Sequence, residues 1–197
     1  MSTEQRFVNY LVRLAHTRDS DPAARATLAM LRRGLGKEPG EAPEMYRYVQ
    51  PRLAAVAEWD EGRYYLVASL FAAHQVNWPE TDTPDPRRLN IGASFRQFIN
   101  AKPESSDSTQ RRFEALLECD REELPIHLRH AVSLLKSDEV PIHWEQLLWD
   151  IALWSREGKP VQRRWARAFW DTASRDEDGP NELANDESNS EQTKEGD

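Results

Sequence analysis

The spacing of apolar residues is the feature that most restricts the fold of this chain. Trp144, Leu147, Leu148, Ile151 and Trp154 fall at relative positions 0, 3, 4, 7 and 10, which is the pattern of one buried face of an α-helix. The same period recurs along most of the chain, whereas the apolar–polar alternation typical of strands is almost absent. With only 8 glycines as well, the sequence argues against a sheet and predicts an all-α protein.

Several helix boundaries are marked by proline, glycine or a capping side chain. Asp21 and Pro22 are residue types favoured at an N-cap and at the first helical position, and Gly34 is expected to end that helix. Pro125 and Pro160 are each expected to begin a helix. We predict a compact bundle of about eight or nine helices, in which short loops favour antiparallel neighbours.

The longest irregular stretch lies at residues 77–90 and follows a strong helical pattern at 62–76. It contains three prolines and is a candidate boundary between two small lobes. We assign residues 1–175 to one helical domain. Residues 176–197 consist mostly of acidic and small polar residues, which cannot bury enough apolar surface to offset chain entropy, so we predict a disordered acidic tail.

The charge of the chain is unevenly distributed. Its formal net charge is -8, but residues 176–197 hold nine acids and one base, so residues 1–175 are neutral with 25 of each. Of those 25 bases 21 are arginine, whose planar guanidinium suits phosphate groups and stacks on rings. The two ends of the neutral part, 1–37 and 156–175, are basic and its middle is acidic.

Nine arginines form the candidate binding site, in four clusters: Arg32 and Arg33; Arg111 and Arg112; Arg121 and Arg129; Arg163, Arg164 and Arg167. The last three are spaced to share one helix face, opposite the apolar stripe. Arg111 and Arg112 are expected to begin a helix, where the helix dipole disfavours cations, and a bound phosphate is one reason for such a placement. A solvated face with nearby acids is the alternative for each cluster.

The sequence contains no constellation that indicates catalysis. His127 and His130 share a predicted helix face, but two histidines alone do not define a metal site, so a metal hydrolase is a weak alternative. His74 is expected to be a buried, hydrogen-bonded histidine, and His143 is expected to cap a helix. Acidic neighbours raise the thiol pKa of Cys119, which argues against a nucleophile. We expect a non-enzymatic protein with no cofactor and no metal.

The ordered landmarks of the chain resemble the CasB family, the small subunits of the type I-E CRISPR surveillance complex called Cascade. The resemblance covers about residues 5–172 and rests on AMLRRG at 29–34, PEMYRYVQP at 43–51, NIGASFR at 90–96, RRFEALL at 111–117, LR at 128–129, VPIHW at 140–144 and QRRWARAFW at 162–170. No single motif is specific, but the ordered set is. The tail beyond Ser174 is outside the family pattern.

This resemblance implies a non-catalytic helical subunit that lies in two copies against other Cascade subunits and the guide RNA. It implies sequence-independent contacts from the nine arginines to the single DNA strand displaced by the guide RNA, which would stabilise the R-loop. Because the chain lacks a signal pattern and a membrane-length apolar stretch, we expect a cytoplasmic protein without membrane contact. The alternative is a helical adaptor that binds proteins through its Trp-rich C-terminal half and binds no nucleic acid.

Overall fold

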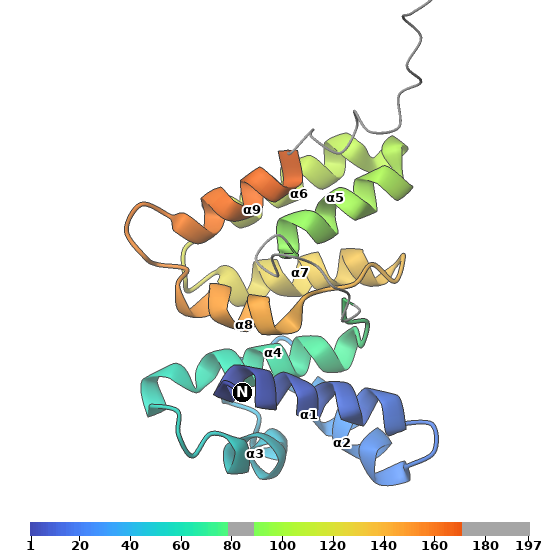
Figure 1. Cartoon of the computed structure of the whole chain (residues 1–197), viewed down its shortest axis with the longest axis vertical. Coiled ribbons are helices and arrows are strands. Elements are labelled where there is room, and N and C mark those ends of the chain that lie inside the picture. The colour runs from blue at the N-terminus through green and yellow to red at the C-terminus, as the bar shows by residue number, and fades with distance from the viewer. Residues whose placement is uncertain (79–88, 171–197) are drawn as a thin grey trace, which may run out of the picture.

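The computed structural model describes residues 1–78 and 89–170. Within these residues the chain forms nine α-helices and no strand, which confirms the predicted all-α fold (Figure 1). The helices are α1 (Thr3–Thr17), α2 (Pro22–Arg32), α3 (Pro43–Val49), α4 (Gly62–Ala73), α5 (Ile91–Ala101), α6 (Ser106–Glu118), α7 (Leu124–Lys136), α8 (Trp144–Ala152) and α9 (Pro160–Trp170). Most of the candidate lobe boundary at 77–90 and all of the predicted tail at 176–197 lie outside the described residues.

The predicted helix ends form for the expected local reasons. The Asp21 carboxylate accepts a hydrogen bond of 2.8 Å from the backbone N–H of Ala23, which satisfies one free donor at the start of α2. That helix ends at Arg32, two residues before Gly34. Pro160 is the first residue of α9, where its missing N–H costs no helical hydrogen bond.

Two helices end earlier than their apolar patterns predict. The apolar pattern spans 62–76, but α4 ends at Ala73. The helix stops there because the backbone that follows it pairs with the segment before α8. There the carbonyl of Val76 accepts hydrogen bonds from the Ile142 N–H at 3.3 Å and the Trp144 indole at 3.1 Å. Trp154 lies beyond the end of α8 but stays buried, because its indole donates to the Cys119 carbonyl at 3.1 Å.

The helices are stacked along the long axis of the molecule (Figure 1). Helices α1 to α4 lie at one end and α5, α6 and α9 at the other, with α7 and α8 between them. Helix α4 contacts both α7 and α8, so its surface is buried on nearly every side. One hydrophobic core therefore connects the two ends.

A buried ion cluster joins α1, α4 and α8 inside this core. The Arg63 guanidinium donates to Glu4 at 3.0 Å, to Asp60 at 2.7 Å and to the Leu148 carbonyl at 2.9 Å. The Arg63 side chain is 5% exposed, so its charge depends on these partners rather than on water. Burial alone would raise the pKa of Glu4, but hydrogen bonds from its backbone, Arg63 and Tyr64 lower that pKa overall.

A second buried carboxylate, on α8, fixes α9. Asp150 accepts hydrogen bonds from the indole of Trp165 at 2.5 Å and the amide of Gln146 at 2.7 Å, and it pairs with Arg164. On its other side α9 packs directly on the backbone of α5, since a Cβ at Gly92 would clash with the Trp165 carbonyl oxygen. The position of α9 is thus set by polar contacts as well as by its apolar stripe.

Candidate nucleic-acid interface

The protein itself binds the guanidinium groups of three of the nine candidate arginines. Arg32 donates two hydrogen bonds, of 3.0 and 2.7 Å, to the carbonyl of Ala72 at the end of α4. Arg121 donates to the carbonyl of Ile151 at 3.3 Å, and Arg164 pairs with buried Asp150. These three side chains stabilise helix ends or a buried carboxylate, so part of their hydrogen-bonding capacity is already used.

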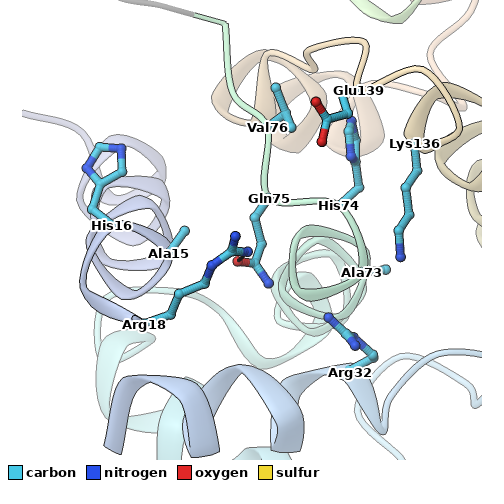
Figure 2. Close-up of a pocket in the computed structure, with 10 residues that line it drawn as sticks. All are labelled: Ala15, His16, Arg18, Arg32, Ala73, His74, Gln75, Val76, Lys136 and Glu139. Carbon is cyan, nitrogen blue, oxygen red and sulfur yellow. Dashed lines mark hydrogen bonds between the residues drawn. The ribbon is translucent and has the colours of Figure 1, made fainter. Parts of the chain in front are cut away.

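Arg32 also lines a hollow of about 380 Å³ in which other cations gather (Figure 2). Arg18 is the C-cap of α1, Arg32 ends α2, and Lys136 ends α7. The end of α4 also lines the hollow, and the Lys136 side chain points toward it (Figure 2). Four helices therefore bring their C-terminal ends to this hollow, and each such end favours a nearby cation. The hollow is basic because its cations lie at helix C-terminal ends, where they interact favourably with the helix dipoles. It also contains one carboxylate, that of Glu139.

Two further candidates have weaker or purely steric contacts. Arg33 lies 3.8 Å from Glu44 in an exposed ion pair, a kind of contact worth little stability. Arg129 is half-buried against the loop after α2. Its Nη1 atom would be 2.5 Å from a Cβ at Gly36, where the backbone has a φ of +80° that glycine favours.

The remaining four candidates are exposed and have no hydrogen bond or ion pair from their side chains within the described residues: Arg111, Arg112, Arg163 and Arg167. The prediction that Arg111 and Arg112 begin a helix is wrong, because five polar residues, Ser106–Gln110, already form the first part of that helix. Helix α6 begins at Ser106, so both arginines lie in its middle and its dipole offers no argument about them. The inference that Arg111 and Arg112 are available to bind phosphate therefore rests only on the exposure of their side chains.

The four unpartnered arginines belong to two helices that touch through aromatic rings. Phe113, directly after Arg112 on α6, stacks on Phe169 of α9 at 4.4 Å between ring centroids and contacts Trp170 at 5.7 Å. Trp170 is 44% exposed and follows Arg163 and Arg167 at positions i+7 and i+3, on the same side of α9. We call Arg111, Arg112, Arg163, Arg167 and Trp170 the α6–α9 arginine surface.

The structure does not gather all nine candidates in one place. Arg32 ends α2 and Arg33 follows it, and α2 lies at one end of the molecule, whereas α6 and α9 lie at the other end (Figure 1). Arg164, expected to share an exposed face with Arg163 and Arg167, is instead half-buried, with 29% of its side chain exposed. The reason is Asp150, an acid one helix away that the spacing on α9 cannot reveal.

The residues considered for catalysis have structural surroundings. His74 is buried, and its Nε2 atom lies 2.7 Å from the Val140 carbonyl, as expected for a satisfied core histidine. His143 caps α8 through a 3.1 Å hydrogen bond from the Gln146 N–H to its Nδ1. Burial, aided by Glu123 and Asp120, raises the pKa of Cys119 to about 12. In residues 1–78 and 89–170 no group of three or more His, Cys, Asp and Glu side chains could hold a metal ion.

The sequence analysis did not single out Trp59, which is the most exposed large aromatic residue in the described ranges and lines a groove with Glu38 and Glu122. A signal was available, because Trp59 lies between Glu58 and Asp60 rather than in an apolar stripe. A tryptophan with acidic neighbours on both sides is a poor core residue.

Fold and site together define an all-helical protein with exposed arginines on two adjoining helices that bind no other group in the part of the chain that the structure describes. A model of the family described as CRISPR-associated protein Cse2 matches residues 27–170. The chain belongs to the Cse2 family, which is also called CasB. In the described ranges, none of its helices is long and apolar enough to cross a membrane.

Individual relatives support the family assignment in sequence and in structure. The CRISPR-associated protein Cse2 of Thermus thermophilus is 32% identical over 186 residues, covering 93% of this chain and 99% of its own. The crystal structure of M. ruber CasB matches with a TM-score of 0.69 and 38% identity, covering 90% of this chain and 97% of its own. A chain of a CRISPR RNA-guided surveillance complex matches with a TM-score of 0.69 and 29% identity, covering 88% of this chain and 98% of its own.

Proposed function

We propose that this protein is a non-catalytic small subunit of a type I-E CRISPR RNA-guided surveillance complex in the cytoplasm. In this role it lies beside other subunits, the guide RNA and a second copy of itself. It stabilises the R-loop by sequence-independent contacts to the displaced DNA strand. The family membership and the likeness to a chain of a surveillance complex support the assembly, and the unpartnered arginines support the DNA contact.

The observation that carries the DNA contact is the α6–α9 arginine surface. These four exposed guanidinium groups, which have no partner among residues 1–78 and 89–170, can bind phosphates without giving up a contact to that part of the chain. Trp170, held edge-on against Phe169 at 4.8 Å, adds an exposed ring on which an unpaired base can stack. Proteins that bind single strands without sequence preference commonly combine cationic side chains with exposed aromatic rings.

The neutral charge of residues 1–175 suggests that this contact works inside an assembly. A neutral body exerts little long-range attraction on DNA, so the isolated protein should bind nucleic acid weakly and in a salt-sensitive way. Partner subunits that already hold the guide RNA and target DNA supply the local concentration. Since R-loop formation is nearly balanced in base-pairing energy, a few phosphate contacts then suffice to shift it.

The assembly is tested by purifying the tagged protein from the cells that make it. Co-purification of a guide RNA of defined length is the expected result. The DNA contact is tested in that purified complex by replacing Arg163 and Arg167 with alanine and measuring dissociation of the target DNA against salt concentration. Loss of two single-strand phosphate contacts should speed dissociation and reduce the slope of log affinity against log salt by about 1.4.

The matched control is Arg6→Ala/Arg13→Ala, which removes the same charge from exposed positions on α1, distant from α6 and α9 (Figure 1). This control should dissociate from target DNA like the unaltered complex. Equal dissociation of both double variants and the parent protein would contradict the DNA contact. Absence of any guide RNA would contradict the assembly.

A helical adaptor without nucleic-acid binding is the second candidate function. Its predicted binding region, the Trp-rich C-terminal half, is largely internal, because Trp144, Trp154 and Trp165 are at most 2% exposed. Exposed Trp59, in the N-terminal half of the chain, is the observation that favours protein binding. A purified protein that carries partner proteins but no RNA would support this second function.

A further inference from the structure

A groove of about 260 Å³ lies between the segment before α4 and the adjoining ends of α7 and α8. Leu66, Leu124 and Ile151 give it an apolar lining, and Glu38 and Glu122 stand at its acidic positions. Its volume is suited to one or two side chains rather than to a folded element. The lining residues belong to segments other than α6 and α9, and the carboxylates among them give the groove a different chemical character from the α6–α9 arginine surface.

Trp59 lines the groove and is 81% exposed, more than any other large apolar residue in the described part of the chain. It belongs to a short 3₁₀ turn, Glu58–Asp60, whose last residue binds the buried Arg63 guanidinium through two hydrogen bonds of 2.7 and 2.8 Å. The turn is therefore held firmly, and the indole ring is presented to solvent by a rigid support. Trp149, 40% exposed, lies beside the same arginine, with its ring centroid 5.8 Å from the Arg63 Cζ.

The charges around the groove are unbalanced in favour of carboxylates. Arg63 is matched by two carboxylates, Glu4 and Asp60, so Arg121 is the remaining cation of the lining, and its one hydrogen bond goes to the neutral Ile151 carbonyl. Glu38 and Glu122 are exposed and form no ion pair within the described part of the chain. An exposed indole face beside two unpaired carboxylates is a receptor for a cationic side chain.

We propose that this Trp59 groove is a docking site for a different protein, which inserts an arginine or lysine side chain flanked by apolar residues. The cation lies against the Trp59 ring and pairs with Glu38 and Glu122, and the flanking residues pack on Pro39 and Pro125, which are partly exposed in the groove lining. Charge complementarity selects this occupant. A nucleic-acid strand carries negative charge and would be repelled by the same two carboxylates.

The proposal is independent of the α6–α9 arginine surface and of the DNA contact assigned to it. It gives the protein two opposite surfaces: a basic one for phosphates and an acidic, aromatic one for a basic protein segment. Each surface can fail its test while the other passes.

The test uses the full-length chain with Trp59→p-benzoylphenylalanine, expressed in the cells that make the protein and irradiated before lysis. The expected product is a cross-link to a different protein, mapped by mass spectrometry to a segment that contains Arg or Lys. Adding Glu38→Lys/Glu122→Lys should reduce the yield at least tenfold. The matched control Glu104→Lys/Glu118→Lys, at exposed acids outside the groove, should leave the yield unchanged.

Thermal melting shows whether each variant is folded. If Glu38→Lys/Glu122→Lys does not fold, Glu38→Gln/Glu122→Gln takes its place. A cross-link to DNA or RNA, a cross-link to a second copy of this chain, or no cross-link would overturn the proposal. A yield that is unaffected by removing the charges of Glu38 and Glu122 would also overturn it.

Discussion

The start of α4 and the outer face of α9 use arginine in opposite ways. At the start of α4, Arg63 is buried among Glu4, Asp60 and the Leu148 carbonyl. Each of its three guanidinium nitrogens donates at least one hydrogen bond to these partners. On the outer face of α9, Arg163 and Arg167 are exposed and bind nothing in the described structure. The same residue type holds the fold together in one region and remains free for a ligand in the other.

The difference shows that the number of arginines says little about where a polyanion binds. Arg163 and Arg164 are neighbours in sequence, yet only Arg164 meets a buried carboxylate. A buried cation is useful to the fold because its removal would leave an unpaired acid, and for that reason it is not available to DNA. The comparison can be tested by removing one arginine at a time from each region.

Arg63→Met should have the largest effect on stability. It leaves the carboxylates of Glu4 and Asp60 without their cation in a site that is nearly closed to water. Breaking a buried ion pair in this way costs about 3–5 kcal/mol in the free energy of unfolding. Urea denaturation measures this loss, and Arg163→Met is the matched control, expected to change the free energy by less than about 0.5 kcal/mol.

Part of the loss should be recovered when one acid is removed as well. Glu4→Gln/Arg63→Met leaves one carboxylate, Asp60, without a cation instead of two, and should be more stable than Arg63→Met alone. If Arg63→Met and Arg163→Met were equally stable, the contrast between the two regions would fail.

Arg164→Met should have an intermediate effect, because its side chain is partly open to water. It leaves Asp150 with hydrogen bonds from Trp165 and Gln146 but without a cation, and burial already raises the pKa of Asp150. We expect a loss of about 2 kcal/mol in the free energy of unfolding. Asp150→Asn in the same chain should recover part of it, and denaturation of the three proteins side by side is the measurement.

The predictions from sequence succeeded where the determining contacts are local. The Asp21 cap, the start of α9 at Pro160 and the buried stripe of α8 depend on residues within one or two helical turns. The positions of Arg32, Arg121 and Arg164 depend on carbonyls or carboxylates 14 to 40 residues away. Helical spacing shows which face an arginine occupies but not which group from another helix lies opposite it. For the same reason the sequence did not predict the Trp59 groove, whose lining residues come from four separate parts of the chain.

Acidification should weaken the buried region and leave the exposed arginines unaffected. Burial lowers the pKa of both His74 and His143, so the folded protein keeps these rings neutral while the unfolded chain takes up protons below about pH 6.5. Because the unfolded state binds more protons in this range, the free energy of unfolding falls as the pH drops below that value. For His143, protonation would also remove the Nδ1 acceptor that caps α8.

His143→Asn separates this effect from general acid denaturation. Asparagine accepts the same capping hydrogen bond from the Gln146 N–H but does not titrate, so the helix start is preserved. Between pH 7 and pH 5.5 the variant should lose less stability than the parent chain, by a difference on the order of 1 kcal/mol. Urea midpoints at the two pH values provide the measurement. Equal losses in the two proteins would mean that the protonation of His143 is not linked to folding, and the buried region would then owe its acid sensitivity to His74 and the carboxylates alone.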